Sequence, residues 1–433
     1  MAVGRPVTGA IERGKGNAVS ETTTSDAVSF PVESEPAPSA APPTGSAPSA
    51  VCRPPAGLAE RRVRSLLARA DVRVDGGRPW DISVHDRRFY GAVLRRGITG
   101  AGDAYADGWW DCEAIDELLA RVVAADLPAA VGLMPHALLT FIRHRILNLQ
   151  TPRRAHVNGR AHYDRGNRLF EAMLDSRLTY SCGYWSAGAR SLEEAQEAKL
   201  DLICRKLKLR PGQRVLDIGC GWGSFVRFAA ERYGASCVGI TVSTEQAEYA
   251  RRCCADLPVE IELMDYRDLR GRYDRVVSIG MLEHVGPKNY ATFARTVDNV
   301  LEDDGLALLH FFASPRSFPN LRDTEVDWFE RNIFPGLVIP SLAQIGAAID
   351  GRFVLEDLHN FGADYHPTLL AWWRNFDEAW PTLRVQCGYD ERFRRMWKFY
   401  LLAAAGAFLC RKYQVWQLVL SQRGVRGGYV GIR

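Results

Sequence analysis

Apolar and polar positions in the middle of the chain fall into blocks that switch between the spacing of strands and the spacing of helices. Short apolar runs predict strands at 215–218, 236–242, 259–264, 273–279 and 306–313. Apolar residues at helical spacing predict helices at 191–209, 224–234, 244–255 and 289–301. Because strands alternate with helices, we expect an α/β fold whose parallel sheet is covered on both faces.

A glycine-rich turn, Asp217-Ile-Gly-Cys-Gly-Trp-Gly, joins the first predicted strand to the following helix. Its glycines allow a sharp turn and leave backbone N–H groups uncovered, and Ser224 is the expected N-cap of the helix. The spacing fits neither the dinucleotide fingerprint nor the phosphate-binding loop, which needs Lys followed by Ser or Thr. The turn is similar to that of S-adenosylmethionine-dependent methyltransferases, and an ordinary tight turn is the alternative.

Polar residues follow the carboxyl ends of the predicted strands, where an open α/β sheet binds its ligand. They are Thr241 and Gln246 after the second strand, Asp265 after the third, and Glu283 and His284 after the fourth. His310 lies within the fifth strand. These positions predict one site along a single edge of the sheet.

The sequence predicts that the whole chain divides into three parts. Residues 1–56 are rich in Ala, Pro, Ser and Thr, and with few large apolar groups they predict a disordered tail. Residues 57–150 combine helical patterning with aromatic residues, which predicts a small, mainly helical N-terminal domain with room for a short sheet. Residues 151–433 then form the main domain, and the last third of the chain is unusually aromatic. Those aromatic residues are typical either of a plain core or of the walls of an apolar tunnel.

Two segments before the first predicted strand have unusual patterns of basic, polar and aromatic residues. The stretch 138–149 interleaves apolar residues with Arg143, His144 and Arg145, and Arg153 and Arg154 follow. This pattern is compatible with a helix on an anionic membrane surface and equally with a packed helix that exposes its arginines. Residues 155–185 are polar, aromatic and irregular in period, which predicts a loop that closes over a site.

Composition narrows the classes of function. The 433 residues carry a formal net charge of only +4, which does not indicate nucleic-acid binding. The 10 cysteines lack the spacing of a disulfide framework or a zinc site, so a reducing cytosol is expected. Neither a transmembrane run nor the apolar core of a signal peptide is expected from the sequence.

Seven segments from about residue 97 to 422 resemble the cyclopropane-fatty-acyl-phospholipid synthases of bacteria. They are Tyr105-Ala-Asp-Gly-Trp-Trp, His162-Tyr-Asp, Tyr180-Ser-Cys-Gly-Tyr-Trp, Val215-Leu-Asp-Ile-Gly-Cys-Gly-Trp-Gly, Asp265-Tyr-Arg-Asp, Ser278-Ile-Gly-Met-Leu-Glu-His-Val-Gly-Pro-Lys-Asn-Tyr and His359-Asn-Phe-Gly-Ala-Asp-Tyr. The glycine turn is shared by many methyltransferases, whereas Glu283-His-Val-Gly, Tyr180-Ser-Cys and the 359–365 segment are more specific. The resemblance implies a Rossmann-like class I methyltransferase domain.

The resemblance also implies a chemistry and its residues. Enzymes of this family add the methyl of S-adenosylmethionine to a cis double bond of a phospholipid acyl chain, and a bound bicarbonate removes a proton as the ring closes. The matching bicarbonate ligands are Cys182, Glu283, His310, Tyr365 and the backbone N–H of Phe312. The matching cofactor contacts are Tyr180, Ser181, Asp217, Gly219, Gly221, Thr241, Gln246, Asp265 and Tyr266.

Several of these residues have a simpler explanation if taken alone. Cys182 fits a small buried apolar position, His310 a hydrogen-bonded core histidine, and Tyr365 a packing residue. Asp265 fits either the adenine edge or the cap of a turn. Two bare carboxylates repel one another, so beside bicarbonate Glu283 is expected either to be protonated or to orient His310.

The chain departs from the family pattern after the fifth strand. There it reads His310-Phe-Phe-Ala-Ser-Pro-Arg-Ser, where a smaller pair and a Gly are expected, and the loop to Trp328 is longer. We expect the bulk of Phe311 and Phe312 to narrow or redirect the acyl path. We therefore expect this departure to change which acyl chain is accepted more than which reaction is catalysed.

The resemblance implies a cytoplasmic enzyme, peripheral on the inner face of the membrane, that acts on unsaturated acyl chains in a phospholipid bilayer and forms a homodimer. Other outcomes of the same fold remain open. They are methyl-branched or methylene fatty acids, modified mycolic acids, a small soluble acceptor, and a silent lipid-binding homologue. The retained Cys182, Glu283, His310 and Tyr365 favour an enzyme over the silent homologue.

Overall fold

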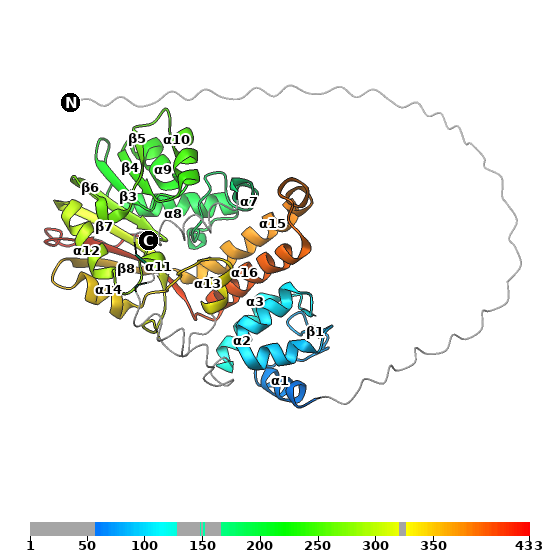
Figure 1. The fold of residues 1–433 in the computed structure, drawn as a ribbon. Coiled ribbons are helices and arrows are strands. Elements are labelled where there is room, and N and C mark those ends of the chain that lie inside the picture. Colours follow the sequence, from blue (N-terminus) through cyan, green and yellow to red (C-terminus); the bar gives the residue numbers. More distant parts are fainter. Residues whose placement is uncertain (1–56, 128–147, 149, 152–165, 320–325) are drawn as a thin grey trace, which may run out of the picture. The chain divides into compact units, whose positions relative to one another are not determined.

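Seven strands form the central sheet of the structure, a computed structural model that describes residues 57–127, 148, 150, 151, 166–319 and 326–433 (Figure 1). The strands are β3 (Arg214–Ile218), β4 (Ser236–Thr241), β5 (Val259–Leu263), β6 (Tyr273–Ile279), β7 (Leu301–Ala313), β8 (Val354–Asn360) and β9 (Gln414–Ser421). Their order is β5-β4-β3-β6-β7-β9-β8. The strands from β5 to β7 are parallel, and β9 is antiparallel to both of its neighbours.

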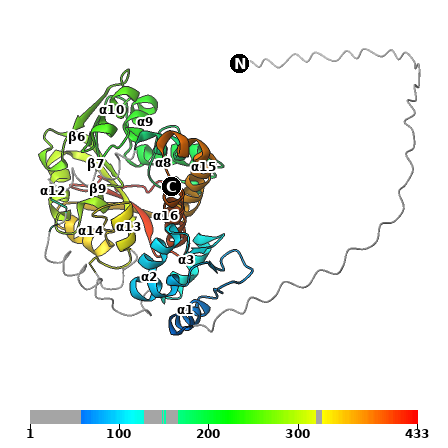
Figure 2. The same ribbon diagram turned by 45° about the vertical axis from the view of Figure 1, so that its right-hand side comes forward.

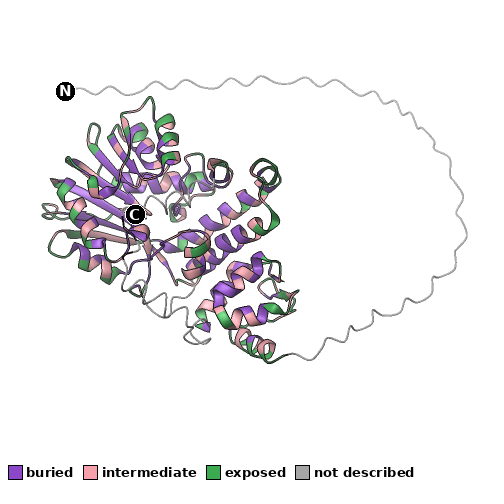
Figure 3. Ribbon diagram, in the orientation of Figure 1, coloured by how far each residue is buried: buried purple, intermediate pink, exposed green. Residues whose placement is uncertain are grey.

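Helices cover both faces of the sheet because the strands are apolar on both faces (Figure 3). On β3, Val215 packs with α8 (Leu192–Lys206), α9 (Ser224–Tyr233) and α10 (Thr244–Cys253). Its neighbour Leu216 packs on the opposite face with α12 (Tyr290–Val300) and α14 (Leu342–Ile349). Successive residues of a strand point to opposite faces, so one short strand contributes to two cores.

A helical layer lies beside the sheet and includes the N-terminal helices (Figure 2). It contains α1 (Leu58–Arg69), α2 (Arg88–Ala106), α3 (Ile115–Ala124), α13 (Val326–Asn332), α15 (Tyr365–Cys387) and α16 (Glu391–Leu409), with the small sheet β1 (Ser83–Val84) and β2 (Trp110–Asp111). Helix α16 packs against α2, α3 and α15. Gly97 interrupts α2 with φ 54° and ψ −133°, a conformation that suits glycine.

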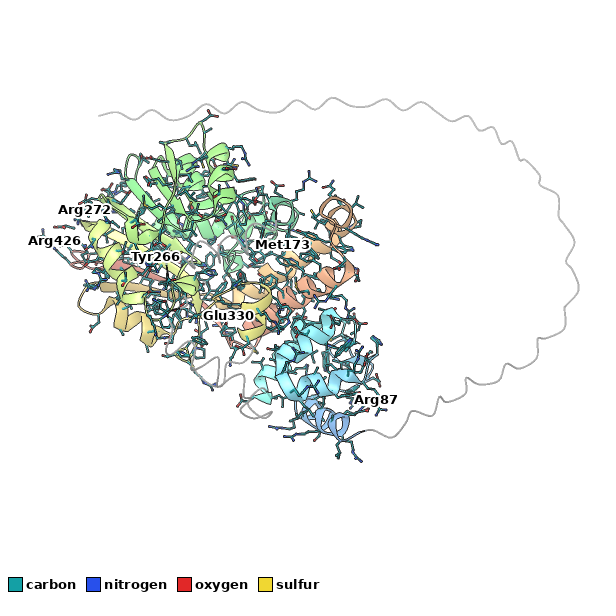
Figure 4. All side chains as sticks on the ribbon, viewed as in Figure 1. Arg87, Met173, Tyr266, Arg272, Glu330 and Arg426 are labelled. Carbon is teal, nitrogen blue, oxygen red and sulfur yellow. The ribbon has the colours of Figure 1, made fainter. Side chains whose placement is uncertain are left out.

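The structure confirms the predicted parallel sheet and the helices between its strands. Two predictions are wrong in detail. The N-cap of α9 is Gly223, and Ser224 is instead the first helical residue, with its hydroxyl 2.6 Å from that of Thr179. The segment 167–173, expected to be part of a loop, forms α7 (Asn167–Met173), whose residue Met173 accepts a hydrogen bond from the indole of Trp397 (Figure 4). Strands β8 and β9 were not predicted.

Some predictions lie outside the described residues. These are the tail 1–56, the basic residues Arg143, His144, Arg145, Arg153 and Arg154, and the motif that begins at His162. The boundary at residue 150 between two domains stays a prediction. In the part of the chain that the structure describes, we find no helix with both the length and the apolar character needed to span a bilayer.

Glycine at position 406 allows α16 to pack closely on α3. A Cβ atom there would overlap the carbonyl oxygen of Asp116 and lie 3.0 Å from the Cβ of Leu119. Gly346 in α14 is different, since a Cβ atom there would meet nothing within 4 Å.

We therefore predict that Gly406→Ala lowers the free energy of unfolding by roughly 1–3 kcal/mol, because two packed backbones must separate. The matched change Gly346→Ala should raise it by about 0.5–1 kcal/mol, since alanine restricts the unfolded chain and favours the helix. Chemical denaturation of both variants measures the difference. Equal effects at the two positions would contradict the close packing of α3 on α16.

Candidate active site

A cavity lies at the carboxyl ends of β3, β4, β5 and β6 and is called here the nucleoside cavity. All nine residues that the sequence assigned to the cofactor line it: Tyr180, Ser181, Asp217, Gly219, Gly221, Thr241, Gln246, Asp265 and Tyr266. The parallel order of these strands brings their ends together, as expected for an open α/β sheet.

The glycine turn forms the floor of the nucleoside cavity. Gly219, Gly221 and Gly223 have φ values of 88°, 56° and 85°, which residues with a side chain rarely adopt. The prediction that the turn leaves its N–H groups uncovered is wrong in part, because Gly219 and Cys220 both donate to the carbonyl of Ile240. The turn is thus anchored to β4, and Gly221 provides a side-chain-free wall.

Asp217 and Lys199 are both buried at the nucleoside cavity. Burial raises the pKa of Asp217 to about 7, against the opposing effect of the Lys199 cation, and its Oδ1 has no hydrogen-bond partner. Burial also lowers the pKa of Lys199 to about 8, and its ammonium donates to the hydroxyl of Ser181 at 2.7 Å. A positively charged ligand group beside Asp217 would favour the ionised carboxylate.

Buried side chains hold the segment that carries Tyr180 and Ser181. The amide of Gln196 donates to the carbonyl of Ser181 at 2.8 Å, and Asp175 accepts the N–H of Thr179 at 2.7 Å. The phenol oxygens of Tyr180 and Tyr400 lie 2.7 Å apart. These contacts fix the segment between the nucleoside cavity and the helical layer.

The far end of the nucleoside cavity is lined by residues that follow β5. Asp265 caps the turn Tyr266–Asp268 by accepting the N–H of Arg267 at 3.0 Å, and it pairs with the Arg267 guanidinium at 2.8 Å. The structure therefore shows the capping role that was one of the two alternatives for Asp265. Tyr266, labelled in Figure 4, is buried with no partner for its hydroxyl.

A second cavity, called here the acyl cavity, adjoins the first. Tyr180, Ser181, Gly280, His284 and Phe334 line both cavities. Its other walls are mostly aliphatic and aromatic residues from the helical layer, including Phe329, Leu337, Leu369, Tyr400 and Phe408. Some of the aromatic residues in the last third of the chain therefore line a cavity, while others, such as Trp397, belong to the core.

Glu283, His310, Phe312 and Tyr365 also line the acyl cavity. Glu283 Oε1 accepts the backbone N–H of Phe312 at 2.6 Å, while Glu283 Oε2 and His310 Nε2 are buried without a hydrogen-bond partner. Buried polar atoms are normally paired, so these two atoms are candidates to bind a polar ligand in the acyl cavity. Burial raises the pKa of Glu283 to about 7, so both of its protonation states are accessible near neutral pH.

Gln417 positions the ring of His310 from the neighbouring strand. The two residues are paired in register between β7 and β9, and Gln417 Nε2 lies 3.3 Å from His310 Nδ1. Burial keeps the pKa of His310 well below its ordinary value, so the ring is neutral. With the amide donating to Nδ1, the ring proton resides on Nε2 and makes this atom a donor toward the acyl cavity.

Two predicted residues are not placed as expected, and the backbone N–H of Phe312, predicted as a bicarbonate ligand, donates to Glu283 instead. Cys182 is buried but does not line the acyl cavity, because its thiol donates to the carbonyl of Gly183 at 3.2 Å. Phe311 does not narrow the acyl path, since it points to the opposite face of the sheet and packs against Trp416. Phe312 does line the cavity, with its ring 5.0 Å from that of Tyr365.

Lys199 was not predicted to line a cavity, Tyr400 was predicted only as one of the aromatic residues of a core or an apolar tunnel, and His284 was placed after a strand without a role. Lys199 had a detectable signal, because it lies four residues after Ala195 and three before Leu202 on the buried face of α8. His284 lines both cavities, and burial lowers its pKa to about 4. The Tyr400 pairing with Tyr180 joins positions 220 residues apart, which no local pattern reveals.

Comparisons with known proteins bear on this pair of cavities. Residues 150–418 match the family described as mycolic acid cyclopropane synthetase. The chain is similar to a cyclopropane-fatty-acyl-phospholipid synthase of Escherichia coli, with 46% identity over 372 residues that cover 85% of this chain and 94% of the relative.

Solved structures show the same fold. The cyclopropane synthase MmaA2 from Mycobacterium tuberculosis has a TM-score of 0.57 and 29% identity, covering 61% of this chain and 97% of its own. The mycolic acid cyclopropane synthase CmaA1, complexed with SAH and CTAB, has a TM-score of 0.57 and 30% identity over the same shares of the two chains.

The raised pKa of Glu283 predicts a pH-dependent stability. The native state holds the Glu283 proton with a pKa of about 7 against an ordinary 4.5, so stability falls as pH rises between these values. Gln cannot ionise, and Glu283→Gln should therefore gain stability relative to the unchanged chain, by up to roughly 3 kcal/mol above pH 7 and little below pH 4.5.

Urea unfolding of both proteins from pH 4 to pH 8 measures this difference. The change Glu113→Gln, at an exposed carboxylate, is the matched control. A Glu283→Gln effect of the same size at every pH would show that Glu283 is not desolvated as described.

Proposed function

The chain belongs to the mycolic acid cyclopropane synthetase family, and we propose that it methylenates a cis double bond in the acyl chain of a phospholipid to form a cyclopropane ring. It is an S-adenosylmethionine-dependent C-methyltransferase that acts on lipid. The observation that carries the proposal is the shared wall of the two cavities, at which Tyr180, Ser181, Gly280, His284 and Phe334 meet. A polar cofactor site and an apolar substrate site adjoin there.

The nucleoside cavity fits S-adenosylmethionine, which supplies an electrophilic methyl group on a sulfonium centre. Asp217 Oδ1 and the Tyr266 hydroxyl are buried polar atoms without partners that such a ligand would satisfy. Gly221 permits close approach of the ligand to the backbone, since its added Cβ would meet only Gln246 Nε2, at 3.9 Å. Lys199 and Gln196 hold Ser181, which lies where this cavity meets the acyl cavity.

The acyl cavity suits a reaction in which positive charge develops on a hydrocarbon. The faces of aromatic rings attract a cation, and Phe312, Phe334, Tyr365 and Tyr400 line the cavity. Burial lowers the pKa of His284 to about 4, so the imidazole at the junction is neutral and adds no opposing charge. The apolar walls also exclude water, which would otherwise capture the cation.

We infer that the proton acceptor is a bicarbonate ion held in the acyl cavity. The donors that face it are His310 Nε2–H, set by Gln417, and the carboxyl of Glu283 when protonated. A pKa of about 7 makes protonated Glu283 available, which avoids two adjacent carboxylates. No hydrogen bond joins Glu283 to His310, since Oε1 accepts the N–H of Phe312 and Oε2 has no partner, which supports this state over a Glu283 that orients His310.

The site of action follows from the substrate. We propose that the protein acts as a peripheral enzyme on the inner, cytoplasmic face of a bilayer that contains unsaturated acyl chains. The homodimer implied by the family resemblance is a further part of this proposal.

The proposal predicts turnover on vesicles of a phosphatidylglycerol with cis-monounsaturated chains, in the presence of S-adenosylmethionine. NMR of the product should show cyclopropane ring protons, which distinguish the ring from a methylene isomer of equal mass. Glu283→Gln should lower kcat by about 10²–10³ because an amide cannot exchange a proton with the anion, whereas a carboxyl with a pKa of about 7 can. Cofactor binding, measured by calorimetry, should be unchanged in this variant, and Glu113→Gln should be fully active. Full ring formation by Glu283→Gln would contradict the proposed base site.

A second prediction concerns bicarbonate itself. Turnover should fall by at least tenfold in buffer freed of carbon dioxide and return on addition of bicarbonate. His310→Ala should raise the bicarbonate concentration required for half-maximal rate, because it removes one donor. A rate independent of bicarbonate would exclude this ion as the base. It would not contradict the proposed transfer of the methyl group.

A further inference from the structure

A third cavity lies among the N-terminal helices and is called here the helix cavity. Its walls come from α1, α2, α3 and α16, with Leu66, Ala101, Leu118 and Phe399 among them. Among the residues that the structure describes, no charged residue and no hydroxyl or amide side chain lines it. Water has few partners in such a place, whereas a hydrocarbon is stabilised there.

The helix cavity and the acyl cavity share part of their walls. Ile98 and Leu119 line both of them. Ile98 follows Gly97, where α2 leaves the helical conformation, and Gly97 itself lines the helix cavity. The break in α2 therefore lies where the two apolar spaces meet.

Helix α16 contributes residues to the walls of both cavities. Phe399 lines the helix cavity, and Ala403, Ala404 and Ala407 line the acyl cavity. At a rise of about 1.5 Å per residue, Ala403 lies roughly 6 Å and Ala407 roughly 12 Å further along the helix axis than Phe399. Tyr400, next to Phe399, already lines the acyl cavity, so the two cavities adjoin there and the acyl cavity continues alone toward the C-terminal end of α16.

The two ends of this path differ in polarity. Lys412, just beyond the C-terminal end of α16, lines the acyl cavity, so a cationic side chain lies at that end. At the Phe399 end, the described residues that line the helix cavity are aliphatic or aromatic, and none of them is charged. A phospholipid acyl chain has the same asymmetry, with a charged headgroup at one end and a methyl group at the other.

We propose that the helix cavity receives the methyl end of the acyl chain whose double bond lies in the acyl cavity, and that it thereby sets the chain length the enzyme accepts. This inference rests on the proposed function. It assigns the N-terminal helices a direct part in substrate selection.

The experiment uses the full-length protein and a 1:1 mixture of two phosphatidylglycerols in vesicles. Both lipids have the cis double bond at the same distance from the ester, and one has four more carbons beyond it. Ala101→Phe fills the helix cavity and should lower the ratio of long to short cyclopropane product at least tenfold. Ala124→Phe, at an exposed position of α3, is the matched control and should leave the ratio unchanged.

A second variant, which enlarges the cavity where Ala101→Phe fills it, tests the inference even if Ala101→Phe does not fold. Leu66→Ala enlarges the helix cavity and should move the product ratio toward the long chain. An unchanged ratio in Leu66→Ala and in folded Ala101→Phe, or an equal loss of both products, would overturn the inference. No ring product from either lipid with the unchanged protein would instead overturn the proposed function.

Discussion

The desolvation of Glu283 and His310 in an apolar cavity is the constraint on which the rest of the site depends. An ionised carboxylate or imidazolium is costly in such surroundings, so burial raises the pKa of Glu283 and lowers that of His310. Both groups can then be neutral donors near neutral pH, in a place where water cannot compete. A proton acceptor confined between them would be close to the substrate and protected from solvent. The same burial explains why each group has a fixed partner, Phe312 N–H for Glu283 and Gln417 for His310.

Strand geometry places these groups. His310 and Phe312 are two residues apart on β7 and therefore face the same side, whereas Phe311 between them faces the opposite core. Glu283 comes from α11 (Leu282–Val285), directly after β6, the parallel neighbour of β7. Parallel pairing thus brings the end of one strand beside the interior of the next. The antiparallel strand β9 adds Gln417 in register with His310, so the sheet supplies both the donor and the residue that orients it.

The sequence was informative where function depends on local pattern. Strand ends predicted Thr241, Gln246 and Asp265, the family resemblance supplied the other cofactor positions, and all nine line the nucleoside cavity. The family resemblance identified Glu283, His310, Phe312 and Tyr365, which converge from three parts of the chain. It could not determine side-chain direction, as Cys182 and Phe311 show. It also could not reveal the pairing of Gln417 with His310 or of Tyr400 with Tyr180, since the partners are distant in sequence and Gln417 lies in β9, which was not predicted.

The helical layer is part of the site and not only a support for it. Leu119 and Val123 of α3 line the acyl cavity, and the segment that carries Tyr180 reaches α16 through Tyr400. This arrangement requires small residues on α16. Gly406 lets α3 approach, while Ala403, Ala404 and Ala407 leave the space that larger side chains would fill. Large aromatic residues on the remaining faces of α15 and α16, such as Trp372 and Trp397, are buried and keep the layer rigid around that space. The alternation of small and large residues therefore both forms the cavity and stabilises its walls.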